Sequence, residues 1–218
     1  MADDLKYGYK GAEPTQSFGN NTGVFDPNDI NNLIADNKWT TFGQLELIET
    51  QTYSSAVTSI DFTDIKQNEY DIHFMTFNNM KTNTDNKETI CARVLVNGVE
   101  QSTSSYKRAL QRVCTNSTYS TESRSTSDTL FRAVFGTGTA TGEGTSGYFY
   151  FYNLGDSSKY SSVTSHITSL TSNAEYVASY GSQTYYVANE VDGIKIRHNT
   201  STVTYADFDI SLYGIRSY

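Results

Sequence analysis

Residues 45–78 of the chain, LELIETQTYSSAVTSIDFTDIKQNEYDIHFMTFN, decide the fold class. Near the end of this stretch two sets of residues alternate: Tyr70, Ile72, Phe74 and Thr76 in one set, and Asp71, His73, Met75 and Phe77 in the other. Alternation with a period of two is typical of a β-strand. We expect His73 to point out of this strand, as a surface or half-buried structural histidine. Shorter strands are expected around Ile60–Ile65 and from Leu45 onward.

Strand signals continue from this stretch towards the C-terminus. Asn97-Gly98 follows an alternating run at 90–96, and Asn-Gly after such a run is the strongest short signal for a β-hairpin. Residues 115–128 are nearly all Ser, Thr, Asn or charged, residues 136–147 are rich in Gly and Thr, and both segments are expected to be loops. Further strands are expected at Val99–Ser102, Leu130–Phe135, Tyr148–Tyr152, Val163–Leu170, Tyr176–Tyr180, Tyr185–Ala188, Ile194–Arg197 and Phe208–Ile215. Residues 104–113 fit a strand or a helical turn, and a strand is favoured.

This pattern of about ten strands separated by short turns is typical of a β-sandwich or barrel. The composition agrees, because 17 Tyr and 11 Phe against 2 Pro favour strands over long helices. For residues 44–218 we predict an all-β fold, a jelly-roll-like antiparallel β-sandwich. In a jelly roll the Phe208–Ile215 strand would pack near Leu45–Asn78, which brings the two ends of the β domain together.

Charge and hydropathy exclude several classes of partner. The net charge of -8 repels phosphate backbones, so we expect no nucleic-acid binding. No apolar run approaches the roughly 20 residues that span a bilayer, so no membrane insertion is expected. The first residues, MADDLKYGYK, lack the apolar core of a signal peptide. Cys91 and Cys114 are too few for a disulfide framework, and two buried thiols are the expectation.

Residues 1–43 are interpreted as an extended anchoring arm that contains one short helix, at about 27–36. Asp26 suits the N-cap and Pro27 the first helical position. Phe25 can pack on Ile30 as a hydrophobic staple. A helix this short must dock on something, either this protein's own sheet or a neighbouring protein. The candidate anchoring residues are Phe25, Asp26, Pro27, Ile30, Leu33, Ile34 and Trp39.

No motif indicates an enzyme, a cofactor or a metal site. Gly142–Gly147 formally fits GxGxxG, but the strand YFYFY follows it instead of the helix that a dinucleotide site needs. The carboxylates near 85–88 and 207–209 lack EF-hand spacing and are interpreted as solvated turns. The histidines show neither zinc-ligand nor nucleophile-elbow spacing, and structural roles are expected for His73, His166 and His198.

Tyrosine is in surplus over what a core requires. An aromatic ring with a polar tip suits protein interfaces and glycan platforms. Strand propensity and core filling are the equally weighted alternative. The residues in question are Tyr7, Tyr9, Tyr148, Tyr150, Tyr152, Tyr180, Tyr185, Tyr186, Tyr213 and Tyr218.

Segments near both ends of the β region resemble virion structural proteins of tailed double-stranded DNA phages, especially phages of marine bacteria and cyanobacteria. One segment is Leu47–Thr52 with Ser59–Thr63 and Tyr70–Phe74, and the other is Asp209–Ile215. The arm motif Gly23–Ile30 is similar to N-terminal segments of such proteins. Together these segments bracket most of the chain, while residues 100–200 contribute composition only.

The resemblance implies a virion protein that is assembled in the host cytoplasm and is not an enzyme. The first hypothesis is a head decoration protein that docks on the major capsid protein through its arm and displays the β-sandwich. The alternative is a tail fibre or receptor-binding protein that recognises host-surface glycans and joins other tail proteins. A homotrimer is a further expectation. A glycan-cleaving enzyme is a third hypothesis and would need two carboxylates in one cleft.

Overall fold

The computed structural model describes residues 27–35, 45–85, 90–115, 120–133, 136–200 and 202–215. The chain divides into two units, Met1–Gly43 and Gln44–Tyr218. In the first unit, helix α1 spans Pro27–Ala35, which confirms the predicted short helix. In the described residues no helix has the length and apolar character that crossing a bilayer requires.

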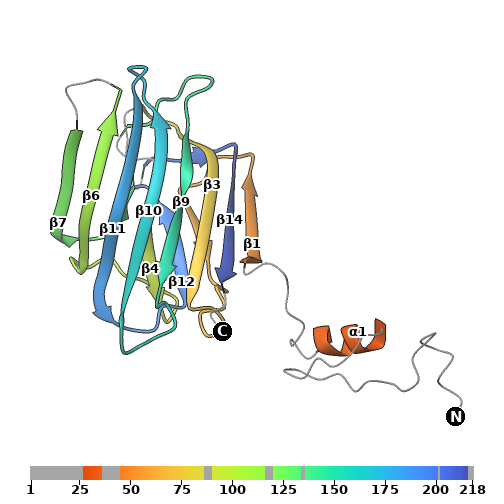
Figure 1. Cartoon of the computed structure of the whole chain (residues 1–218). Helices are drawn as coiled ribbons and strands as arrows, with labels where there is room; N and C mark the ends of the chain where they lie inside the picture. The colour runs from red at the N-terminus through yellow and green to blue at the C-terminus, as the bar shows by residue number, and fades with distance from the viewer. Residues whose placement is uncertain are drawn as a thin grey trace, which may run out of the picture. The chain divides into compact units, whose positions relative to one another are not determined.

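The strands of the second unit form two antiparallel sheets, and Figure 1 shows the larger one with β4 and β12 of the smaller one behind it. The large sheet has the order β1 (Leu45–Tyr53), β14 (Phe208–Ile215), β3 (Ile72–Thr82), β9 (Thr145–Tyr152), β10 (Tyr160–Leu170), β11 (Tyr176–Ala188), β6 (Tyr106–Cys114) and β7 (Ser120–Asp128), with β13 (Tyr205–Ala206) paired to β3. The small sheet has the order β2 (Ser59–Phe62), β12 (Gly193–Arg197), β4 (Cys91–Val96) and β5 (Val99–Glu100), with β8 (Phe131–Arg132) also paired to β4.

Eight of these strands have the connectivity of a jelly roll. In chain order they are β1, β2, β3, β4, β8, β9, β12 and β14. In the large sheet the neighbouring strands β1, β14, β3 and β9 are the first, eighth, third and sixth of this set. In the small sheet the neighbouring strands β2, β12, β4 and β8 are the second, seventh, fourth and fifth. That double Greek-key order defines the jelly roll, so the predicted jelly-roll-like antiparallel β-sandwich is confirmed.

Strand β14 closes the domain as predicted, because it lies between β1 and β3. Its Tyr213 pairs with Leu47 on one side and with Phe74 on the other. The hairpin signal at Asn97-Gly98 is also confirmed, since both residues have positive φ, 51° and 71°, and connect paired strands β4 and β5. Positive φ at both central positions is what a tight hairpin turn requires.

Two further pairs of strands widen the large sheet beyond the jelly roll. β6 and β7 are inserted between β5 and β8, and β10 and β11 between β9 and β12. The two insertions meet where β11 pairs with β6. The large sheet therefore continues past β9 by four strands, β10, β11, β6 and β7 (Figure 1).

The core lies between the two sheets. His73 points into this core, so its predicted orientation is wrong. Met75 and Phe77 are buried, and so is His73, whereas Ile72 and Phe74 are only half-buried on the outer face. The Nε2–H of His73 donates to the carbonyl oxygen of Ile65 at 2.7 Å, and burial lowers the pKa of the imidazole. The prediction failed because apolar residues occupy both faces of β3, so alternation alone does not identify the buried one.

The predicted loop at 115–128 is wrong, because residues 120–128 form strand β7. This strand lies at the edge of the sheet, where its backbone pairs with β6 and polar side chains can face water on both sides. The loop predicted at 136–147 is also too long at its C-terminal end, because strand β9 begins at Thr145.

The strands predicted at Tyr176–Tyr180 and Tyr185–Ala188 are one strand, β11. Gly181 lies in its middle, where a Cβ atom would collide with the carbonyl oxygen of Ala109 on β6. Gly181 therefore serves the close approach of two strands. The strand predicted at Leu130–Phe135 is shorter, since β8 covers Phe131–Arg132.

Candidate binding surface on the large sheet

The outer face of the large sheet carries an aromatic surface. Because paired residues of neighbouring strands point to the same face, the strand registers place side chains in rows across the sheet. One row crosses eight strands through Leu47, Tyr213, Phe74, Tyr150, Thr164, Ser182, Ala109 and Arg124. The next row runs through Thr50, Ser211, Thr76, Tyr148, His166, Tyr180, Gln111 and Glu122.

The rings in these rows contact one another, and the ring of Tyr152 stacks on that of Tyr150. We call these seven rings the aromatic ladder: Tyr213, Phe74, Tyr150, Tyr152, Tyr148, His166 and Tyr180. Phe74 stacks on Tyr150 with ring centroids 4.5 Å apart. At the other end, His166 lies between Tyr148 and Tyr180, with centroids 6.1 and 5.9 Å away. Edge and offset contacts at such distances are the favourable geometries of aromatic pairs. The ladder is therefore a supported platform rather than a set of isolated rings.

The platform ends in a groove over β10, β11, β6 and β7. A hollow of about 680 Å³ lies beside Tyr148, His166 and Tyr180. A second hollow, of about 370 Å³, shares Tyr180 with the first and continues to Glu122 and Arg124 on β7. We call the two together the groove. Both volumes fall within the range of small-ligand sites.

The groove exists because its floor has small side chains. Ala109, Ala178, Gly181 and Ser182 lie between the ring of Tyr148 and the strand β7. Tyr180, which is 44 % exposed, stands up from this floor. The alternation of β11 puts Ala178, Tyr180 and Ser182 on the same outer face, and Gly181 between them has no side chain, so the shape of the floor follows from the sequence of the strand.

A ligand in the groove would meet two kinds of group. Rings with a polar tip or edge line one wall, and Gln111, Glu122 and Arg124 supply an amide, a carboxylate and a guanidinium at the far end. Such a combination suits a ligand with apolar faces and many hydroxyl groups. No group of three His, Cys, Asp or Glu side chains that could hold a metal ion occurs in the described ranges.

A second aromatic pair lies on β10 and β11 outside the groove. The rings of Tyr160 and Tyr186 have centroids 4.3 Å apart, and the ammonium of Lys107 lies 3.2 Å from the centre of the Tyr186 ring. A hydrogen bond with Tyr186 raises the pKa of Tyr160. The cation–π contact and the bond hold these exposed rings in place.

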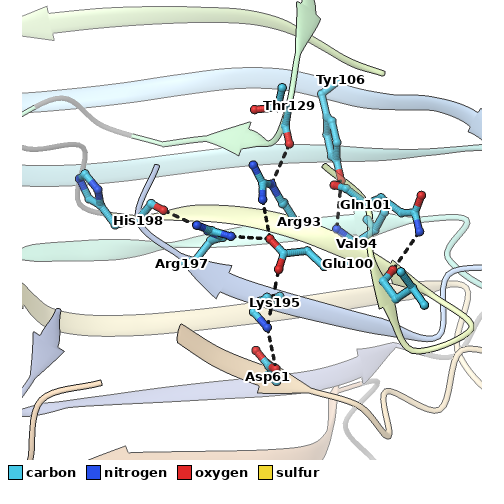
Figure 2. A network of polar contacts seen from close by, with 11 residues as sticks. Asp61, Arg93, Val94, Glu100, Gln101, Tyr106, Thr129, Lys195, Arg197 and His198 are labelled. Atoms are coloured by element: carbon cyan, nitrogen blue, oxygen red, sulfur yellow. Dashed lines mark hydrogen bonds and ion pairs between the residues drawn. The ribbon is translucent and has the colours of Figure 1, made fainter. Parts of the chain in front are cut away.

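The small sheet carries a network of ion pairs around Glu100, shown in Figure 2. The guanidinium groups of Arg93 and Arg197 lie 2.5 and 2.6 Å from one oxygen of Glu100, and Lys195 lies 3.8 Å from the other. Burial alone would raise the pKa of Glu100, but Arg93 and Arg197 together outweigh it and lower that pKa. Lys195 also pairs with Asp61 at 3.0 Å. Both carboxylates of the network are therefore paired with cations of the chain, and these pairs link β2, β12, β4 and β5.

The predicted anchoring residues fall on the other unit of the chain. Pro27 is the first residue of α1, and Leu33 and Ile30 are half-buried on it. Ile34 is 56 % exposed, and none of the helix side chains is buried. Phe25, Asp26 and Trp39 lie outside the described residues.

The sequence singled out part of the aromatic ladder and missed the rest of the site. Tyr148, Tyr150, Tyr152, Tyr180 and Tyr213 belong to the ladder, whereas Tyr185 is buried in the core and Tyr7, Tyr9 and Tyr218 lie outside the described residues.

The other groups of the site come from segments without an apolar pattern. His166 belongs to a Ser- and Thr-rich strand, and Glu122 and Arg124 belong to the segment expected to be a loop. No signal in the sequence pointed to them. Of the two cysteines, Cys91 is buried as expected but Cys114 is only half-buried, and neither is in a disulfide.

Comparison of the chain with protein-family models, curated proteins and solved structures finds no match.

Proposed function

We propose that this chain is a non-enzymatic binding protein of a phage virion whose large sheet recognises host-surface glycans in the groove. The observation that carries the proposal is the row Tyr148, His166, Tyr180, Gln111 and Glu122, which changes across five neighbouring strands from rings to hydrogen-bonding groups. The sequence resemblance supports the virion setting, and jelly rolls occur in both viral and lectin domains.

Sugar rings match this row in chemistry. Their C–H faces are apolar and can lie on the rings of Tyr148 and Tyr180, while their hydroxyl groups can bond to Gln111, Glu122 and Arg124. The groove is open and elongated across the strands β10, β11 and β6, so it can take several units of a chain rather than one buried sugar. Small floor residues leave the space that this needs.

Binding without cleavage is the function that the lining supports. Hydrolysis of a glycosidic bond normally uses two carboxyl groups on either side of the bond. Among the lining residues of the two hollows, Glu122 is the single carboxylate. A lone carboxylate at one end of a groove is suited to orienting a ligand through hydrogen bonds.

Substitution of Tyr180 tests the proposal directly. The full chain is expected to bind one or more polysaccharides on an array of bacterial surface glycans. Tyr180→Ala should weaken this binding about tenfold, since buried aromatic anchors typically carry more than 1–2 kcal/mol of binding free energy. Titration calorimetry with the best array ligand provides the measurement.

Tyr176→Ala is the matched control, because Tyr176 lies on the same strand and is 51 % exposed but does not line the groove. It should change the affinity less than about twofold, as residues away from the centre of a site do. Equal binding by the Tyr180→Ala variant, or no binding to any surface glycan, would contradict the proposed function.

Capsid decoration through the arm is the second candidate function, and the surface of α1 favours it. Ile30, Leu33 and Ile34 recur at helical spacing, and none of them is buried. An apolar stripe on a nine-residue helix gains its stability from what covers it, because so short a helix is marginal alone. The surface of a capsid subunit could supply that cover.

Charged substitutions on two different faces of α1 distinguish capsid docking through the arm from glycan binding in the groove. Replacing both Ile30 and Ile34 with Asp should abolish co-sedimentation with capsids that lack the protein, and deleting residues 1–40 should do the same. The control replaces the exposed Asn31 and Asn32 with Asp, which adds the same charge without touching the stripe. Undiminished capsid binding by the Ile variant would exclude docking through α1, while glycan binding should be the same for all these variants.

A further inference from the structure

The edge strand β7 is complementary to a second copy of itself. Its sequence is STESRSTSD over Ser120–Asp128, and in the described part of the chain its strand partner is β6 alone. Pairing with β6 is regular from Ser120 to Ser125, so the opposite side of the strand presents an even row of backbone groups. Exposed edges of this length are usually blunted by charged side chains, especially Lys, by Pro or by a bulge, and charges protect an edge when a second copy cannot neutralise them. The regular part of β7 has no Lys, Pro or bulge, and its two charges, Glu122 and Arg124, have opposite signs.

The positions of the two charges select one way of pairing. In an antiparallel pair with a two-fold axis at Ser123, Glu122 of each copy lies opposite Arg124 of the other. Thr121 then lies opposite Ser125, and such cross-strand pairs are favourable. Moving the axis to Glu122 or to Arg124 places two like charges opposite each other, which is unfavourable. Of these three axes, only the one at Ser123 places Glu122 and Arg124 each opposite a residue of opposite charge.

The geometry points to a homodimer in which β7 pairs antiparallel with β7 of a second copy about a two-fold axis at Ser123, joining the two large sheets. Glu122 and Arg124 are exposed on the outer face, and neither forms an ion pair among the described residues. Their charges are therefore available to a partner. The axis runs perpendicular to the sheet, so the outer faces of both copies lie on the same side.

The dimer also completes the groove. Glu122 and Arg124 line its far end, and in the dimer each of them acquires the opposite charge of the second copy beside it. The two grooves then meet end to end across the axis. This arrangement gives a glycan two identical sites on one surface, and linked sites bind a repeating ligand more tightly than either does alone.

Charge reversal tests the dimer independently of any glycan. Sedimentation over a concentration series should show a reversible dimer for the full chain. Glu122→Arg and Arg124→Glu should each raise the dimer dissociation constant at least about tenfold, because each variant turns two attractive cross-strand pairs into repulsive ones. Far-UV circular dichroism confirms that each variant is folded.

Two rescue measurements exclude a general loss of structure. An equimolar mixture of the two single variants should form a heterodimer, because an edge with two Arg then faces an edge with two Glu. The double variant, with both charges exchanged, should dimerise as the original chain does. A chain that is monomeric at every concentration, an oligomer that neither single variant weakens, or a mixture that fails to form heterodimers would each overturn the proposal.

Discussion

Replacing Phe149 with alanine is expected to lower the free energy of unfolding by about 3–5 kcal/mol, the usual cost of deleting a buried phenyl ring. Phe149 is fully buried on the inner face of β9. Its ring lies 5.8 Å from that of Phe77 and 5.7 Å from that of Phe151. The void left by the ring cannot collapse easily, because rigid neighbouring strands surround it. Chemical denaturation of the variant and the original chain gives the difference.

The adjacent residue on the same strand is the control. Tyr150 is half-buried on the outer face and stacks on Phe74, so Tyr150→Ala should cost only about 1 kcal/mol, the size of an aromatic pair contact. The comparison tests which face of Tyr148–Tyr152 points to the core. A Tyr150 variant as unstable as the Phe149 variant would show that both faces of β9 are covered.

Substitution of Asp128 by alanine is expected to destabilise the domain by about 3 kcal/mol, in the range found when one member of a buried ion pair is removed. The Asp128 carboxylate is 9 % exposed and lies between Arg108 and Arg132. Its bonds with these two residues connect the end of β7 to β6 and β8. Without the carboxylate, the charges of two arginine side chains that are 12 % and 18 % exposed are left without it in a region with little water.

Asp156→Ala is the matched control for that substitution. Asp156 also forms an ion pair, with Lys159, and that pair together with Ser158 lowers the pKa of the carboxyl to about 2. The pair is open to solvent, however, and exposed pairs contribute little. Unfolding curves measured side by side should show a large shift for the Asp128 variant and almost none for the Asp156 variant. Equal shifts would mean that burial does not distinguish the two sites.

Local sequence was sufficient for the jelly-roll scaffold and for helix α1. Asn97-Gly98 specifies its turn because few residue pairs tolerate positive φ twice in succession. Pro27 marks the start of α1 because the first turn needs no N–H from it. The pairing of Phe208–Ile215 with the opening stretch followed from the jelly-roll hypothesis, in which the last strand lies between the first and third.

Features that depend on neighbours in space were beyond local sequence. His73 was assigned to the wrong face, since both sets of alternating residues in β3 contain apolar side chains and only the position of the small sheet decides between them. The polar composition of 115–128 predicts a loop, and this prediction is wrong because an edge strand such as β7 can be polar on both faces. Its backbone hydrogen bonds are formed with β6, and the pattern of its side chains does not predict this pairing.

The sequence by itself determined that this protein is an all-β jelly-roll-like sandwich with an excess of tyrosine and a short helix that begins at Pro27. Only the tertiary structure decided where the tyrosines lie and what accompanies them. Tyr148, Tyr180 and Glu122 come from three strands that are far apart in the chain. The strand registers bring them into one row. Register is a relation between strands, set by backbone pairing and by core residues on the opposite face, so no single stretch of sequence contains it.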